Sequence, residues 1–125
     1  GNPIACSAAL KVLELLKAEL LERAERLGET VQRRFMELQK SFPLIGEVRG
    51  LGPMVGIELV KDPDTREPAA DEAKELARRC LEKGLIILSC GNFGNVIRTL
   101  MPFVINEEQL DKGFSILSES LSEMY

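Results

Sequence analysis

Arg98 is the residue of this sequence best suited to chemistry, because it interrupts a segment that is otherwise fit for burial. It lies in the run V-I-R-T-L-M at positions 96–101. A guanidinium in apolar surroundings costs several kcal/mol unless it has a partner. Arg98 should therefore pair with a carboxylate of the protein, such as Glu58, or face a cleft that binds an anion. Its planar fork fits a carboxylate through two parallel hydrogen bonds. Composition alone favours the structural ion pair over the ligand site.

Three further features could bind a ligand, and each has a plainer explanation. Arg49 lies in V-R-G-L-G, residues 48–52, where a surface or interdomain ion pair is the favoured role. The glycines of C-G-N-F-G-N, residues 90–95, would let a turn approach a ligand, but a hairpin explains them. Asn2 and Pro3 open a helix whose free N–H groups could bind an anion, which is a weak signal alone.

The cysteines and the missing histidines restrict the chemistry further. Cys6, Cys80 and Cys90 are an odd number at wide spacings, which indicates free thiols in a reducing compartment and predicts a cytoplasmic location. We expect Cys6 to be packed on a helix face with Ala9 and Leu13. The chain has no histidine, which excludes a Ser-His-Asp triad, a Cys-His dyad and histidine metal sites within it. It also has no nucleotide-binding or metal-binding motif, so it holds no complete catalytic centre.

Composition indicates one globular domain and excludes two classes of partner. The chain has 125 residues, of which 45% are hydrophobic and 29% charged. Sixteen basic against 20 acidic residues give a net charge of −4, so nucleic acid and anionic membranes are not expected partners. The longest aliphatic run, residues 85–88, is far shorter than the roughly 20 residues that span a bilayer.

Helical periodicity extends from about residue 2 to residue 42. Asn2 can cap the first turn, and Phe42-Pro43 should end the helical region. Two helices or one bent helix fit the pattern, with the break near Glu19. Gly28 lies inside the second stretch, where glycine costs about 1 kcal/mol relative to alanine, so it needs a packing reason or marks a local end.

The remainder alternates paired strands with helices. Residues 45–60 predict two short strands joined by a bend at 50–52. A helix over 69–81 ends at Gly84, and strands are expected over 85–90 and 96–101. Asn106 and Gln109 resemble a capping box that opens the last helix. The order α-α-β-β-α-β-β-α predicts an α+β two-layer sandwich, in which an antiparallel or mixed sheet of about four strands carries helices on one face.

Three separated segments resemble the C-terminal part of class III pyridoxal-phosphate aminotransferases. They are G-N-P-I-A-C-S-A-A-L at 1–10, V-R-G-L-G-P-M-V-G-I-E-L at 48–59, and G-N-F-G-N-V-I-R at 91–98. They occur in the family's order, and the similarity covers essentially the whole chain. The form C-G-x-x-G-N-V-I-R is most similar to the 4-aminobutyrate aminotransferases, with acetylornithine and ornithine aminotransferases as close relatives.

The resemblance implies the small C-terminal domain of a fold-type I enzyme, spanning residues 1–125. Residues 1–42 would lead from the large cofactor domain, and residues 43–125 would form the sandwich. In the family, the arginine at the position of Arg98 binds the α-carboxylate of glutamate or 2-oxoglutarate, so the resemblance favours the ligand role over the ion pair. The intact enzyme would transfer an amino group from 4-aminobutyrate to 2-oxoglutarate, pairing with its own large domain and a homodimer partner.

The resemblance also implies what this chain lacks. The family's cofactor-binding lysine, its aspartate beside the pyridine nitrogen and its stacking aromatic residue all belong to the large domain, upstream of Gly1. This chain is therefore expected to hold no catalytic or cofactor-binding residue and no metal ligand, and to be inactive alone. Two alternatives stay open: an acetylornithine, ornithine or other ω-amino acid aminotransferase, and a free-standing α+β ligand-binding module.

Overall fold

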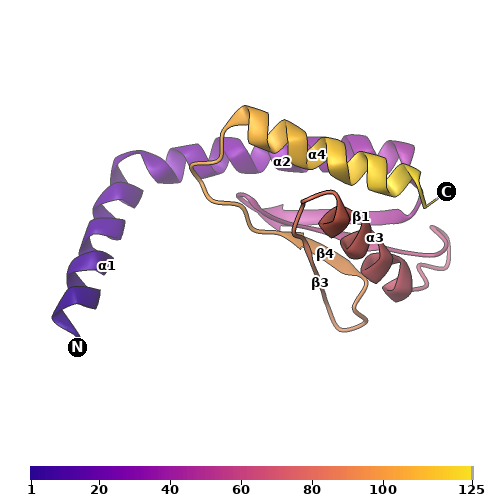
Figure 1. Cartoon of the computed structure of the whole chain (residues 1–125), viewed down its shortest axis with the longest axis horizontal. Helices are drawn as coiled ribbons and strands as arrows, with labels where there is room; N and C mark the ends of the chain where they lie inside the picture. The colour runs from indigo at the N-terminus through magenta and orange to yellow at the C-terminus, as the bar shows by residue number, and fades with distance from the viewer. Residues whose placement is uncertain (125) are drawn as a thin grey trace.

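A computed structural model describes residues 1–124 and shows a layer of helices covering one side of a sheet (Figure 1). The order of elements agrees with the one that the sequence predicts, apart from a short π-helix, η1, inside the first helical region. The helices are α1 (Pro3–Leu15), η1 (Leu16–Leu20), α2 (Leu21–Ser41), α3 (Ala70–Glu82) and α4 (Glu107–Ser122), and the strands are β1 (Ile45–Leu51), β2 (Met54–Leu59), β3 (Leu88–Cys90) and β4 (Val96–Thr99).

The sheet has four strands in the order β1-β2-β4-β3, and each neighbouring pair is antiparallel. This confirms the predicted α+β sandwich, and the sheet is antiparallel rather than mixed. Residues paired across an antiparallel ladder point to the same face. One face carries Val55, Ile57 and Ile97, which are fully buried. The other face carries Gly56 and its partner Arg98, and no helix of residues 1–124 covers it.

The core lies between the sheet and α2, α3 and α4. Helix α2 contributes Val31 and Phe35, both fully buried, and the ring centroid of Phe35 lies 4.9 Å from that of Phe114 on α4. Leu76 of α3 is also fully buried in the same cluster. The predicted boundary at residue 42 coincides with the end of α2, but α2 shares one core with the sheet, α3 and α4.

The first helical region begins and bends where the sequence predicts. The Asn2 side-chain Oδ1 accepts hydrogen bonds from the N–H groups of Ile4 and Ala5 at 2.9 and 3.5 Å, so it caps α1. The π-helix η1 contains Glu19, which confirms the predicted break. Beyond it, α1 projects away from the sandwich (Figure 1), and none of its residues is buried.

Gly28 has a packing reason for its place inside α2. A Cβ atom at this position would lie 2.3 Å from the carbonyl carbon of Gly52 in the turn between β1 and β2. The helix backbone therefore approaches the turn more closely than any side chain would permit. Gly52 itself has a positive φ of 54°, which favours glycine at the turn.

The strands of the second pair are shorter than the sequence predicts. The expected strand over 85–90 is reduced to β3, and the one over 96–101 to β4. After α3, the Leu85 N–H donates a hydrogen bond to the Cys80 carbonyl. Residue 85 therefore still belongs to the C-terminal end of the helix and not to a strand. At the other end, Val55 and Thr99 form the last pair of β2 with β4, so the residues after Thr99 have no neighbouring strand.

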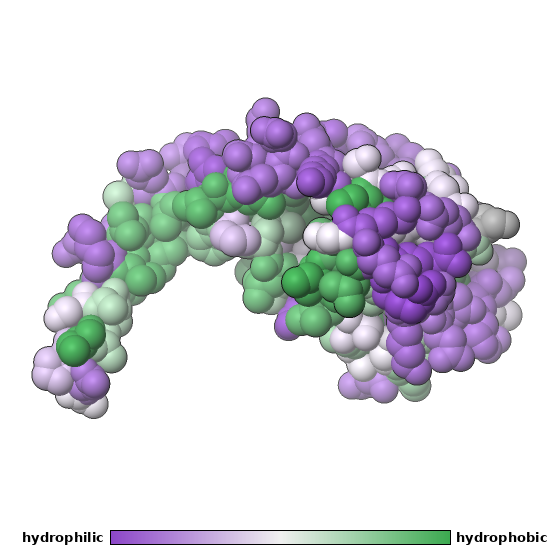
Figure 2. Space-filling model, viewed as in Figure 1, coloured by the Kyte–Doolittle hydropathy of each residue, from purple (hydrophilic) through white to green (hydrophobic). Residues whose placement is uncertain are grey.

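Helix α1 exposes large apolar side chains, and Figure 2 shows hydrophobic residues along the inner side of the bend that α1 makes with α2. Leu10 and Leu13 are 63% and 52% exposed. We expect this 125-residue chain, purified alone, to self-associate through this surface. Light scattering should show an apparent mass that rises with concentration.

The matched variant carries Leu10→Lys and Leu13→Lys, which should abolish this self-association. Because α1 buries none of its side chains, the melting temperature of the variant should stay close to that of the unmodified chain. An unmodified chain that stays strictly monomeric at high concentration would contradict the prediction.

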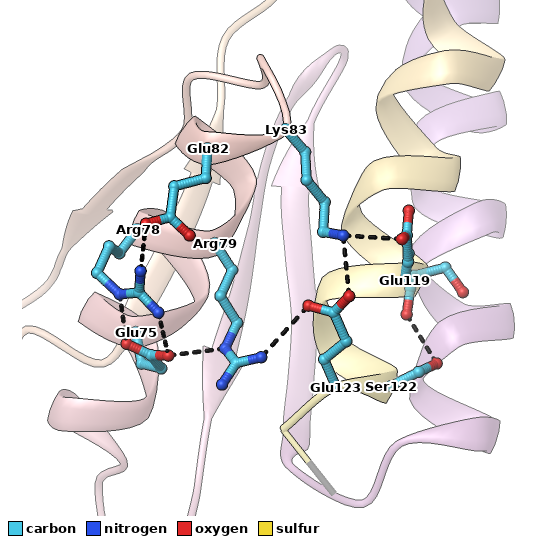
Figure 3. Close-up of polar contacts among 9 residues, drawn as sticks. Glu75, Arg78, Arg79, Glu82, Lys83, Glu119, Ser122 and Glu123 are labelled. Carbon is cyan, nitrogen blue, oxygen red and sulfur yellow. Dashed lines mark hydrogen bonds and ion pairs between the residues drawn. The ribbon is translucent and has the colours of Figure 1, made fainter.

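A network of charged side chains joins α3 to α4 (Figure 3). Lys83, at the end of α3, donates to Glu119 at 2.8 Å and to Glu123 at 2.9 Å. Arg79 connects Glu75, at 2.7 Å, to Glu123, at 3.3 Å. Hydrogen bonds from Arg78 and then Arg79 lower the pKa of Glu75 to about 2. Hydrogen bonding to Lys83 likewise lowers the pKa of Glu123.

This network should make stability depend on pH in the acid range. A carboxyl whose pKa is lower in the folded than in the unfolded state contributes stability above its unfolded pKa and loses it as pH falls through its folded pKa. For Glu75 the contribution should be complete above about pH 5 and decline between about 4.5 and 2. Urea unfolding should therefore show Glu75→Gln less stable than the unmodified chain at pH 7 and nearly equal to it near pH 2.

The matched control is Glu25→Gln in α2. Among residues 1–124 no basic group lies within 4.0 Å of the Glu25 carboxylate, so this variant should follow the pH profile of the unmodified chain. If Glu75→Gln lowered the free energy of unfolding by the same amount at every pH, the loss of stability would not come from the charge network.

Candidate functional site

Arg98 lies on β4 and belongs to the sheet face that no helix covers. The register pairs it with Gly56 on β2 and with Leu88 on β3. Its side chain is exposed, and no carboxylate of residues 1–124 lies within 4.0 Å of its guanidinium. The structure therefore shows neither the burial nor the ion pair that the alternative to a ligand role requires.

Glu58, the expected partner of Arg98, binds Arg49 instead. The Arg49 Nη1 donates to Glu58 Oε2 at 2.7 Å and to Glu47 Oε2 at 3.0 Å. The hydrogen bond to Glu58 raises the pKa of Arg49. Arg49 thus forms the predicted surface ion pair, and the proposed Arg98–Glu58 pair is wrong.

Four residues form one row across the open sheet face: Arg49, Gly56, Arg98 and Leu88. Gly56 has no side chain, so nothing on β2 covers the guanidinium beside it. The charge of Arg49 is matched by two carboxylates, whereas that of Arg98 has no acidic neighbour among the described residues. Arg98 can therefore offer its full fork to an incoming carboxylate.

An apolar pocket of about 460 Å³ lies at the end of β4. Arg98 is the only charged residue among those of its wall, and Gln109 is the only amide. The rest of the wall is mostly aliphatic and aromatic, with Phe35, Ile86, Leu100, Met101 and Phe114 among its residues. Phe35 of α2 and Phe114 of α4 belong to the helix-covered side of the sheet, so the pocket lies mainly on that side, whereas the Arg98 side chain belongs to the uncovered face.

The other candidate features have structural roles. The Asn2 side chain already accepts the N–H groups that could have held an anion. The turn after β3 is fixed by Asn95, a buried residue whose Nδ2 donates to the Leu59 carbonyl at 2.8 Å, in agreement with a plain hairpin. No group of residues within 1–124 has the composition of a metal site, and no helix among them is long and apolar enough to span a membrane.

The three thiols are free. Cys80 is fully buried in the core, and burial raises the pKa of its thiol. Cys6 is exposed, so its predicted packing with Ala9 and Leu13 is wrong: no element of residues 1–124 packs against this part of α1. Glu47 was not predicted as a partner of Arg49. The alternation of side chains along β1 places Glu47 and Arg49 on the same face, so the sequence contained this signal.

Comparison with known protein families and proteins identifies relatives of the chain. The family model described as Aminotransferase class-III matches residues 1–121. The chain belongs to the class-III aminotransferases. Over 125 residues it is 50% identical to the 5-aminovalerate aminotransferase DavT of Pseudomonas aeruginosa, covering 99% of this chain and 29% of that protein. It is 44% identical to the 4-aminobutyrate aminotransferase GabT of Escherichia coli, with 98% and 29% covered.

Solved structures of aminotransferases share the fold. A Bacillus anthracis aminotransferase superposes with a TM-score of 0.89 at 35% identity, covering 98% of this chain and 28% of that one. A PLP-bound amine transaminase from an uncultivated Pseudomonas species gives 0.84 at 30% identity, with 97% and 28% covered. The class-III chain described here thus spans less than a third of the length of these relatives.

Relatives with other chemistry share the same domain. The chain is 42% identical to the leucine/methionine racemase of Thermococcus litoralis, covering 99% of this chain and 28% of that protein. Membership of the family therefore does not by itself fix the reaction or the substrate.

The residues around Arg98 do not fit pyridoxal phosphate. This cofactor requires a lysine amine for its aldehyde and donors for its phosphate. No lysine contributes to the wall of the pocket beside Arg98, and that wall is mainly apolar. The residues around Arg98 therefore do not form a site for this cofactor.

Proposed function

We propose that this class-III chain is the small C-terminal domain of an enzyme that transfers the amino group of 4-aminobutyrate to 2-oxoglutarate. In this proposal Arg98 binds the α-carboxylate of glutamate or 2-oxoglutarate. The observation that supports it is an arginine with an unoccupied fork, on the uncovered sheet face, within the N-V-I-R segment. Pyridoxal phosphate and the residues that hold it would belong to the rest of the enzyme.

The role of Arg98 would be to position the substrate. Two parallel hydrogen bonds fix both the place and the orientation of a carboxylate, whereas a single point charge fixes only its approximate place. Such positioning lowers the barrier because the reacting carbon is already held in the required geometry.

The exposed surfaces support a domain that packs against other parts of the enzyme. The proposed division places residues 1–42 as the helical lead from the large domain, with the sandwich at 43–125. The apolar side chains of α1 and the uncovered sheet face would then be buried against the large domain or the homodimer partner. This arrangement accounts for a helix that buries no residue within its own chain.

5-Aminovalerate is the second candidate amino donor, since the relative of that name is 50% identical to this chain. The two donors differ by one methylene, and a methylene in an apolar pocket changes specificity by about 10- to 200-fold. Acetylornithine and ornithine stay in the comparison as the alternatives from the same family.

The test is an assay of the intact enzyme with pyridoxal phosphate and 2-oxoglutarate. Each of the four donors is supplied separately, and glutamate formation is measured. We expect the highest kcat/KM for 4-aminobutyrate. A higher value for 5-aminovalerate would keep the reaction and change the donor. Preference for acetylornithine, or no glutamate from any donor, would contradict the proposal.

A further inference from the structure

Glu58 lies between two arginines on the open face of the sheet. It is directly opposite Glu47 on β1 and Val96 on β4. Its diagonal neighbours are therefore Arg49 on one side and Arg98 on the other. Diagonal positions of this kind are about 7–8 Å apart, within reach of long side chains. Both guanidinium groups are consequently accessible to the same carboxylate.

The structure shows which of the two arginines Glu58 contacts. Its Oε2 accepts from Arg49 at 2.7 Å, while Arg98 has no carboxylate within 4.0 Å among the described residues. The same Arg49 Nη1 also donates to Glu47 Oε2 at 3.0 Å. Arg49 thus bridges two carboxylates that stand directly opposite each other and would otherwise repel.

Loss of Arg49 would leave this repulsion unbalanced. Glu58 would then have an acidic neighbour on β1 and an unpaired cation on β4, and its side chain is 30% exposed and can turn. Gly56 puts no side chain between Glu58 and Arg98 on β2. The free carboxylate would therefore pair with Arg98.

We propose that Arg49 is a positioning residue that holds Glu58 away from Arg98 and so keeps Arg98 free for the substrate carboxylate. This inference rests on the proposed function of Arg98. Glu58 attached to β2 would otherwise act as a permanently present intramolecular competitor of the substrate. Arg49 does not touch the substrate and acts only through Glu58.

The experiment measures steady-state kinetics of the intact enzyme against 2-oxoglutarate. Arg49→Gln should raise KM for 2-oxoglutarate by about 3- to 30-fold, the range expected when a partly exposed charge-assisted hydrogen bond has to be displaced. The kcat at saturating 2-oxoglutarate should change little, because excess substrate displaces Glu58. The double variant Arg49→Gln/Glu58→Gln should return KM to within about twofold of Glu58→Gln alone.

The rescue separates this inference from a structural role of Arg49. A variant that merely weakens the sheet would not recover on removal of a second charge from it. Arg78→Gln, which changes an ion-paired arginine on α3 away from the open face, is the matched control and should leave KM unchanged. Melting temperatures of all variants show whether each is folded.

Two results would overturn the inference: an unchanged KM in Arg49→Gln, or a raised KM that Glu58→Gln does not rescue. The kinetics of Arg98→Gln, measured alongside, distinguish a failure of the proposed role of Arg98 from a failure of the proposed role of Arg49. If Arg98→Gln leaves KM for 2-oxoglutarate unchanged, the proposed role of Arg98 fails. If Arg98→Gln raises KM and Arg49→Gln does not, only the positioning role of Arg49 fails.

Discussion

Arg98→Ala in the intact enzyme should lower kcat/KM for glutamate by about one to three orders of magnitude. A hydrogen bond to a charged group contributes about 1.5–3 kcal/mol, and the alanine variant loses both the charge and the fork. Arg98→Lys keeps the charge but offers no two parallel donors, so its kcat/KM should lie between those of Arg98→Ala and the unmodified enzyme. Steady-state kinetics with glutamate measure both effects.

Thermal unfolding of the same two variants provides the control. Arg98 is exposed and supports no core contact, so its removal should leave the melting temperature nearly unchanged. A buried ion pair would behave differently, because removing one partner costs about 3–5 kcal/mol of stability and affects every substrate alike. A large loss of stability together with normal glutamate kinetics would contradict the ligand role.

Gly28→Ala should destabilise the domain strongly although alanine favours helix. The added Cβ would lie 2.3 Å from the Gly52 carbonyl carbon and 2.5 Å from its Cα, so the turn between β1 and β2 would have to move away from α2. Backbone atoms cannot rotate aside as a flexible side chain can. Overpacking of this kind costs about 1–3 kcal/mol or more, which exceeds the gain of about 1 kcal/mol in helix propensity. Urea unfolding of the chain carrying Leu10→Lys and Leu13→Lys, with and without Gly28→Ala, measures the difference in the free energy of unfolding.

Gly113→Ala is the matched control, because Gly113 lies inside α4 and has room for a Cβ atom. Its Cβ would meet Leu85 Cδ1 at 3.7 Å, an ordinary contact. This variant should gain up to about 1 kcal/mol of stability from helix propensity. If Gly28→Ala and Gly113→Ala changed the free energy of unfolding equally, the close approach of α2 to the turn would not be what requires glycine at residue 28.

Local signals in the sequence predicted the elements and the fold. Asn2 and the pair Asn106 and Gln109 form the expected caps, since capping depends on residues only two or three positions apart. Alternation over residues 45–60 predicted both strands of the first pair because Val55, Ile57 and Leu59 of β2 alternate with residues that are not buried and all face the core. The four-stranded sheet followed from the pairing of neighbouring strands.

The neighbours of Arg98 could not be predicted, because they depend on the register of β2 against β4, which are far apart in sequence. Glu58 is within reach of both Arg49 and Arg98, and only the three-dimensional placement of Glu47 beside Arg49 shows which pair forms. The reason for Gly28 is likewise a contact across 24 positions, with Gly52. The exposure of Cys6 depends on what α1 packs against, which its own periodicity does not reveal.

The most direct test of the central claim is a crystal structure of the intact enzyme with 2-oxoglutarate bound. We expect the α-carboxylate to lie against Arg98, with two N–H···O contacts of about 2.7–2.9 Å to its guanidinium. Glu58 should remain on Arg49 in that structure. A 2-oxoglutarate whose α-carboxylate is held by other residues, while Arg98 pairs with a carboxylate of the protein, would contradict it.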